Sequence, residues 1–178
     1  MIVIDDRDGN YWEFQGLDVN AKTAHAVARA PTTGSILTST GAPTTQDRIS
    51  ILPTPVGLIR PEEIQQGVIN HALRFATSLS SSAFRAPAIT SDGGNANGMP
   101  NGAHVWLPRS VNISGLGQYE QIVARAMQEY GLYLGDAGGT NVAVYFQSIS
   151  DGITTFHFSS LSMPNSIVTQ LVVLAAGN

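Results

Sequence analysis

Cysteine is absent from this chain of 178 residues. Its absence excludes disulfide bonds, cysteine zinc sites and thiol catalysis together. It leaves the cellular compartment open, because a chain of this length buries a core large enough to fold without covalent links. We therefore expect one domain over residues 1–178, since two domains would each be small.

Basic charge is scarce and dispersed. Lysine and arginine total nine, Lys22 is the only lysine, and the formal net charge is −4. No basic stripe exists to neutralise phosphates, so the sequence argues against nucleic-acid binding. All charged residues make up 12% of the chain, while Gly, Ser, Thr and Asn fill the polar positions. This composition is typical of a turn-rich β protein with a hydroxyl-bearing surface, and we expect an extracellular or virion location.

Long apolar runs are also missing. No stretch of about 18 apolar residues is present, so no membrane span is expected. Met1 is followed by the strand-like IVID rather than by a charged segment and an apolar signal core. If the protein is exported, we expect that the signal lies outside this chain or that release occurs by cell lysis.

The chain begins with a predicted hairpin. Two strand-like runs, Ile2–Ile4 and Tyr11–Leu17, flank DDRDGN, in which Asp8-Gly9 is a hairpin turn signal. The same acidic residues could form a calcium loop, but the EF-hand spacing is missing. Tyr11 and Trp12 fall on opposite faces of the second strand. Trp12 is therefore either a core residue or an exposed platform that stacks on a sugar ring.

A compact unit covers residues 57–77, GLIRPEEIQQGVINHALRFAT. Pro61 presets the backbone for a first helical position and Gly67 can end the helix, which predicts a short helical hook. A β-rich run follows from Val68 to Phe75. Its odd-numbered residues, His71 included, share one face.

His71 has two interpretations. It is either a half-buried histidine bonded to a backbone carbonyl or a carboxylate, or a base or ligand that acts with Glu62 or Glu63. The other three histidines are scattered, without the spacing of a metal site. We predict no metal site and no cofactor.

The loop Ser91–Gly102, SDGGNANGMPNG, is rich in glycine and Asx residues. Asp92 and Asn95 could hydrogen-bond sugar hydroxyls or hold an ion, although Asp-Gly and Asn-Gly pairs also serve turn geometry alone. A short strand, His104–Leu107, follows and carries Trp106, a second aromatic candidate.

One long amphipathic helix is predicted between Ser114 and Gly131. Apolar side chains recur at three- and four-residue steps, whereas Gln128 and its polar neighbours are expected to face outward. Ser114 is the expected N-terminal cap, and Gly131 the expected end.

Four strands are predicted after the helix, namely LYLGD, VAVYFQSI, TTFHF and IVTQLVVLA. The last is nearly continuous in apolar residues, so it is expected to be buried on both faces or to form an interface. The predicted fold is mainly β, an antiparallel β-sandwich of jelly-roll type with one amphipathic helix and a short helical hook.

Three blocks in order carry a resemblance to a family of bacterial secreted proteins, many actinobacterial, and to domains of bacteriophage minor tail proteins. The blocks are GLIRPEEIxxGxIxHALRF, MPNGAHVWLP and QEYGLYLGDAGG, and they span about Leu58 to Phe146. The resemblance implies a β-sandwich in a secreted or tail-associated protein and supplies no catalytic residues. Relatives usually carry β-rich sequence upstream of the point where this chain starts. We therefore expect a homo-oligomer, or a partner chain that completes the sheet.

Two functional classes follow. The first is a non-catalytic structural or adhesive module that binds glycan, with ligand-binding candidates Trp12, His71, Asp92, Asn95 and Trp106. The second is a secreted polysaccharide hydrolase that uses two carboxylates drawn from Glu13, Glu62, Glu63, Asp92 and Asp136. No local spacing pairs any two of these acids, and fingerprints of serine hydrolases and nucleotide-binding proteins are absent. We therefore assign no catalytic residue and favour the first class.

Overall fold

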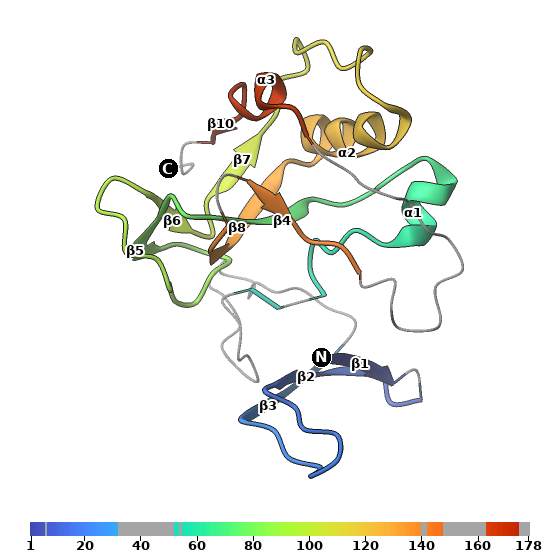
Figure 1. Cartoon of the computed structure of the whole chain (residues 1–178), viewed down its shortest axis with the longest axis vertical. Coiled ribbons are helices and arrows are strands. Elements are labelled where there is room, and N and C mark those ends of the chain that lie inside the picture. The colour runs from blue at the N-terminus through green and yellow to red at the C-terminus, as the bar shows by residue number, and fades with distance from the viewer. Residues whose placement is uncertain (6, 32–51, 54, 140–141, 148–162, 175–178) are drawn as a thin grey trace.

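The computed structural model describes residues 1–5, 7–31, 52–53, 55–139, 142–147 and 163–174. Within this part, more residues lie in strands than in helices, which confirms the mainly β class. The strands form a three-stranded, a five-stranded and a two-stranded sheet (Figure 1). An antiparallel sandwich or jelly roll is not confirmed.

The N-terminal sheet contains β1 (Ile2–Asp5), β2 (Asn10–Gln15) and β3 (Ala26–Pro31), all antiparallel. The predicted hairpin is confirmed, and Gly9 has the positive φ of 65° that its turn requires. The carboxylate of Asp8 accepts the Asn10 N–H and the Arg29 guanidinium, as a turn residue does. Tyr11 is buried and Trp12 half-buried, on opposite faces as predicted.

The five-stranded sheet has the order β10-β7-β8-β4-β9. Its strands are β4 (Leu73–Thr77), β7 (His104–Trp106), β8 (Leu132–Ala137), β9 (Ala143–Val144) and β10 (Val172–Val173). β4 and β8 are parallel, so the expectation of a purely antiparallel fold is wrong here. The long connection between them includes a helix, and only such a crossover can join parallel neighbours.

A small parallel sheet of β5 (Ser80–Phe84) and β6 (Met99–Asn101) lies beside β8. The sequence did not predict β5. Its serine-rich run, SSSAF, lacks the alternation of apolar and polar residues that indicates a strand.

The helical hook, α1 (Pro61–Gln66), begins at Pro61 and ends at Gly67 as predicted. The predicted strand from Val68 is wrong over its first half, because β4 begins only at Leu73, where the N–H bonds to Gly131 O at 2.9 Å. Before that point, residues 68–72 form no strand, and the His71 ring lies within hydrogen-bonding distance of Glu63 and of the neighbouring Ala72 carbonyl.

The amphipathic helix, α2 (Gln118–Glu129), is capped by Gly117 rather than by Ser114. A turn between Ile113 and Leu116 comes first and delays the helix. Gln128 is buried, contrary to the prediction. Its side-chain amide donates to two loop carbonyls, those of Pro108 at 3.1 Å and Val111 at 2.9 Å, so the polar end is satisfied inside the protein.

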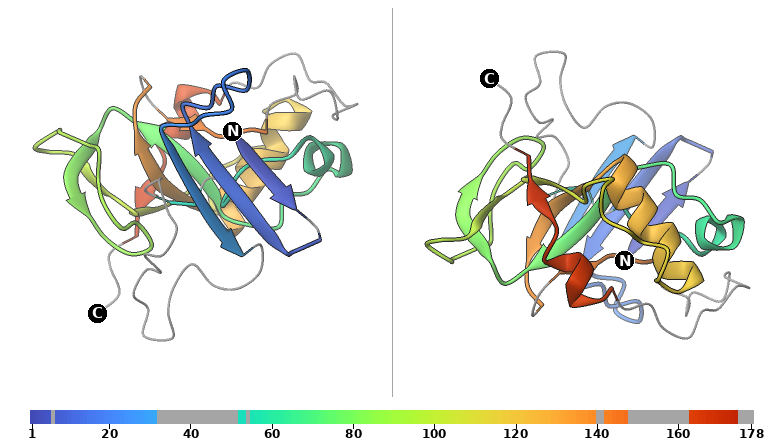
Figure 2. Two further views of the ribbon diagram at one scale, coloured as in Figure 1. Left: turned by 90° about the horizontal axis from the view of Figure 1, so that it is seen from below. Right: turned by 90° about the horizontal axis from the view of Figure 1, so that it is seen from above.

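The main core lies between α2 and the five-stranded sheet. Its largest fully buried members include Val123 of α2, Phe75 of β4 and Leu134 of β8. Figures 1 and 2 place the N-terminal sheet on the opposite side of the five-stranded sheet from α2. No helix in the described ranges has the length and apolar character that crossing a membrane requires.

The C-terminal segment departs from the predicted single strand. Residues Asn165–Val168 form a short helix, α3, and β10 follows as an edge strand. Val172 and Val173 are each 47% exposed, so burial on both faces is wrong for this strand. An interface at this strand stays a prediction. The predicted TTFHF strand lies outside the described residues.

Candidate functional site

An extra residue in β8 places the first side chain of the site. The register runs from Phe75 opposite Leu134 to Ala76 opposite Asp136, so Gly135 has no partner in β4. Such a bulge re-aims the next side chain. A Cβ atom at Gly135 would lie 2.6 Å from the Arg74 Nε, which explains why glycine occupies the bulge.

Arg74 is the cation of the site and is only 4% exposed. Its two terminal nitrogens donate to Leu52 O at 3.1 Å and to Gly135 O at 3.0 Å. The guanidinium carbon lies 4.8 Å from the centre of the Tyr145 ring, within cation–π range. These contacts fix the arginine between β8 and the chain that follows β9.

Asp136 interacts with two side chains. The Tyr145 hydroxyl donates to its Oδ2 at 2.6 Å, and the Asp92 carboxyl lies close enough to shift the pKa of Asp136. Asp92 also accepts the Ala137 N–H, at 3.0 and 3.1 Å to its two oxygens, and the Asn101 amide at 2.9 Å. The loop that carries Asp92 is thereby tied to the end of β8.

The environment shifts the pKa values of the two carboxyl groups apart. Burial, and then the contact with Asp92, raise the pKa of Asp136. Burial acts to raise the pKa of Asp92 as well, but the hydrogen bonds from Asp136, the Ala137 N–H and Asn101 outweigh it and lower that pKa. Of the two carboxyl groups, Asp136 therefore keeps its proton to a higher pH than Asp92.

Tyr145 keeps its proton over a wide pH range. Burial, and then the hydrogen bond to Asp136, raise the pKa of Tyr145 to about 12. The phenol therefore acts as a hydrogen-bond donor throughout the physiological range.

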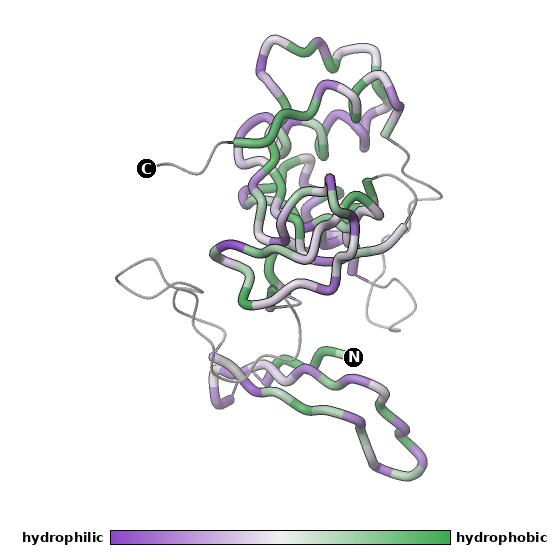
Figure 3. Tube along the Cα trace, turned by 90° about the vertical axis from the view of Figure 1, so that its left-hand side faces the viewer, coloured by the Kyte–Doolittle hydropathy of each residue, from purple (hydrophilic) through white to green (hydrophobic). Residues whose placement is uncertain are grey.

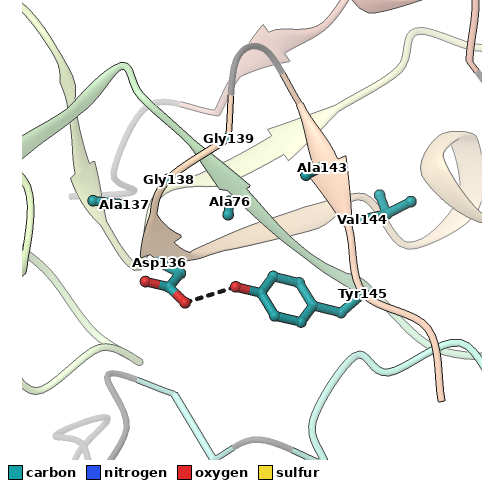
Figure 4. A pocket seen from close by; sticks show the side chains of 8 residues that line it. All are labelled: Ala76, Asp136, Ala137, Gly138, Gly139, Ala143, Val144 and Tyr145. Atoms are coloured by element: carbon teal, nitrogen blue, oxygen red, sulfur yellow. Dashed lines mark hydrogen bonds between the residues drawn. The ribbon is translucent and has the colours of Figure 1, made fainter. Parts of the chain in front are cut away.

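A pocket of about 270 Å³ opens beside this pair (Figure 4). Asp136 and Tyr145 form its polar wall, and their hydrogen bond is drawn in the figure. The other lining residues are small or apolar, namely Ala76, Ala137, Gly138, Gly139, Ala143 and Val144. The site thus combines two hydrogen-bonding side chains with a small, largely apolar hollow.

The candidates from sequence are spread over the molecule. Asp92 belongs to the site, whereas the Asn95 side chain accepts the Asn97 N–H within its own loop. Trp12 is half-buried in β2, with the Arg29 guanidinium 5.4 Å above its ring. Trp106 is half-buried in β7, beside β10. Ligand binding by these residues and by His71 stays a prediction.

Two members of the site were missed, Arg74 and Tyr145. The available signal was Arg74 itself, a charged residue between the apolar residues of LRFAT, which indicates a buried ionic group with a partner elsewhere. Tyr145 had no comparable signal, because an aromatic residue in a predicted strand is ordinarily core.

His71 makes the contacts that the first interpretation names, and its role as a base or ligand stays a prediction. Its Nδ1 lies 2.9 Å from Ala72 O, and its Nε2 lies 3.0 Å from Glu63 Oε1. Both ring nitrogens face oxygen acceptors, so both bonds form only when each nitrogen carries a hydrogen. Glu63 also accepts the Arg60 N–H and guanidinium, each at 2.9 Å, and completes the cap of α1.

Replacing Glu63 by glutamine is expected to lower the free energy of unfolding by about 1–3 kcal/mol at neutral pH, because bonds to a buried charge are lost. Burial acts to raise the pKa of Glu63, but the Arg60 hydrogen bonds outweigh it and lower that pKa. Its stabilisation is therefore present above the ordinary value of 4.5 and lost as the pH falls through the lower folded value. Urea denaturation across acidic pH tests this.

The exposed neighbour Glu62 supplies the control. E62Q should leave the slope of the free energy of unfolding against pH unchanged at acidic pH. Equal slopes for E63Q and the wild type would contradict the assignment.

The carboxyl pair predicts an asymmetry between two amide variants. D136N mimics a protonated carboxyl group and should change the free energy of unfolding little at mildly acidic pH. D92N removes the charge that accepts hydrogen bonds from the Ala137 N–H and the Asn101 amide, and it should cost about 1 kcal/mol or more.

The two groups also contribute pH dependence of opposite sign. The raised pKa of Asp136 favours folding below its ordinary value of 3.8, and this contribution is lost as the pH rises through the folded value. The lowered pKa of Asp92 contributes stability above 3.8, which is lost as the pH falls. Denaturation curves of both variants, measured against pH, check these two contributions. A larger loss in the free energy of unfolding for D136N than for D92N would contradict the raised pKa of Asp136 and the lowered pKa of Asp92.

No protein-family model, curated protein or solved structure matches this chain. The resemblance to secreted and phage-tail domains therefore stays a prediction. Among the residues that the structure describes, no group of three or more His, Cys, Asp or Glu side chains is arranged to hold a metal ion.

Proposed function

We propose that this protein is a non-catalytic module of an extracellular or virion surface, which binds one neutral sugar ring of a glycan in the Asp136 pocket and assembles with further copies. One observation carries the binding part. Asp136 and Tyr145, already held by Asp92 and Arg74, form the polar wall of a pocket of about 270 Å³.

The size and chemistry of the pocket favour a single small ring. Its volume lies just below the roughly 300–1,000 Å³ typical of sites for drug-sized ligands. Asp136 and Tyr145 offer oxygen acceptors and a hydroxyl to sugar hydroxyls. The glycine and alanine walls let the backbone of residues 137–139 approach the ring closely.

The chemistry of the pocket argues against an anionic ligand. Its polar wall carries the Asp136 carboxyl, and no described lining residue is a cation that could pair with an anion. Asp136 accepts hydrogen bonds and Tyr145 donates them, and sugar hydroxyl groups can exchange hydrogen bonds with both.

The N-terminal sheet supports the assembly part. The register places Val3, Trp12, Phe14 and Val27 on one face, where Val3 is 41% and Val27 is 49% exposed. Figure 3 shows the hydrophobic colour along the N-terminal strand. A second copy that covers this face would bury it and would create the two-layered antiparallel sandwich expected from the sequence.

Polysaccharide hydrolysis is the second candidate, and the Asp92–Asp136 pair is what favours it. Hydrolases of this kind hold their two carboxyl groups about 5–5.5 Å or about 6.5–9.5 Å apart, with the sugar or a water between them. Both oxygens of Asp92 accept the Ala137 N–H, one also accepts the Asn101 amide, and Asp92 does not line the pocket, so it is engaged within the protein. Binding without cleavage therefore fits the geometry better.

A glycan array, read with wild-type protein and Y145F, tests the binding proposal. Y145F should weaken every positive signal about tenfold, because the variant lacks the hydroxyl that hydrogen-bonds to the Asp136 carboxyl. Tyr133 of β8, which stacks on His104 with ring centroids 4.3 Å apart, supplies the control variant Y133F. No glycan signal, or an equal loss in both variants, would overturn the proposal. Release of reducing sugar by wild type, abolished in D136N, would favour hydrolysis instead.

Light scattering of the purified protein tests assembly. We expect a mass of at least twice 18.8 kDa that falls toward the monomer in V27D, where a charge enters the exposed face. A wild-type monomer at high concentration would refute this part and leave the glycan proposal standing.

A further inference from the structure

A second, larger cavity lies on another part of the five-stranded sheet. Its volume is about 420 Å³, within the range of small-molecule sites. The walls come from β4, β7 and β10 and from the neighbourhood of α3, and they include Phe75, Val105, Met99, Val168, Leu171 and Val173. None of the described residues that line it is charged, so the cavity suits an apolar group.

Exposed apolar side chains continue from the cavity to the surface. Leu79 is 56% exposed and Val173 is 47% exposed, and both line the cavity. Leu174, next in the chain, is 38% exposed. Figure 3 shows the hydrophobic colour in the last described residues before the C-terminus. An apolar cavity that opens through an apolar rim is typical of a site for an apolar ligand.

A cation lies beside this rim. The Arg85 guanidinium donates to Leu174 O at 3.1 Å, which holds its positive charge one residue away from the lining residue Val173. A guanidinium can donate five hydrogen bonds, and this contact uses one of its terminal nitrogens. The arrangement combines an apolar hollow with an anion-binding group at its edge.

We propose that this cavity binds a linear acyl chain with a carboxylate head, a fatty acid of medium length. The chain lies against Phe75, Val105 and Val173, and the carboxylate pairs with Arg85. The chain gains free energy from the apolar area that it removes from water, and the pairing selects a carboxylate over an alcohol of equal length.

Calorimetric titration of the full chain with decanoate, and with decanol, tests the proposal. We expect saturable binding of one decanoate per chain. V173D should weaken it about tenfold or more, because a carboxylate enters the apolar wall. Val172 supplies a matched control, since it is also 47% exposed in β10 but does not line the cavity. V172D should change the affinity less than about twofold.

R85Q tests the contribution of the carboxylate head group separately from that of the acyl chain. It should weaken decanoate severalfold and leave decanol unchanged. Absence of saturable decanoate binding by wild type would overturn the proposal, as would equal losses in V172D and V173D. Equal effects of R85Q on the acid and the alcohol would overturn the assignment of the carboxylate to Arg85. Circular dichroism of each variant confirms that a loss does not come from unfolding.

Discussion

Replacing Gly57 by alanine is expected to lower the free energy of unfolding by about 2–5 kcal/mol. Gly57 has a φ of +77°, where an added Cβ costs about 1–2 kcal/mol. That Cβ would also lie 2.6 Å from the backbone N of Arg74 and 2.7 Å from the carbonyl carbon of Leu73, an overpacking that costs about 1–3 kcal/mol more. Chemical denaturation measures the loss.

Gly67 isolates the conformational part of this effect. Its φ of +80° is nearly the same, but nothing in the described part of the chain lies within 4 Å of the position of an added Cβ. G67A should therefore cost only about 1–2 kcal/mol. Equal stabilities of G57A and G67A would contradict the close approach of Gly57 to the backbone of β4.

Replacing Arg74 by methionine is expected to cost about 3–5 kcal/mol, the loss typical when one member of a buried charged set is removed. The carbonyls of Leu52 and Gly135 would lose their donors, and Tyr145 would lose the cation above its ring. Because Arg74 acts to lower the pKa of Asp136, the variant should also raise that pKa further.

Arg29 provides a comparison of the same residue type at the surface. It too lies over an aromatic ring, Trp12, and pairs with a carboxylate, Asp8, at 2.9 Å. Its side chain is 48% exposed, so R29M should cost only about 0–1 kcal/mol. Urea denaturation compares the two variants, and equal losses would show that burial does not determine the role of Arg74.

Local signals in the sequence predicted much of the fold. Asp8-Gly9 predicted the first turn, Pro61 and Gly67 predicted both ends of α1, and the apolar stripe predicted α2. Each signal acts within a few residues, where propensity and periodicity apply. The predictions failed where a distant contact overrides the local pattern. The burial of Gln128 depends on loop carbonyls 17 and 20 residues away, and strand β4 starts only at Leu73, whose N–H bonds to the distant Gly131 O.

The candidate site could be predicted only in part for the same reason. Asp92 and Asp136 were both considered as acids, but 44 positions separate them in the printed sequence, and no spacing rule brings them together. The Gly135 bulge and the hydrogen bond that the Ala137 N–H donates to Asp92 bring the two acids to the same end of β8. Tyr145 is positioned by the pairing of β9 with β4, two strands that are also far apart in the sequence.

Sugar binding at the Asp136 pocket is the central part of the proposed function, and an NMR titration of the backbone amides with a panel of neutral monosaccharides tests it most directly. We expect saturable shifts of the Ala137, Gly138 and Gly139 amides, which line the pocket, and their loss in Y145F. Shifts centred on Trp12 or Trp106 instead, or no shifts with any sugar, would contradict the assignment of this pocket as the binding site.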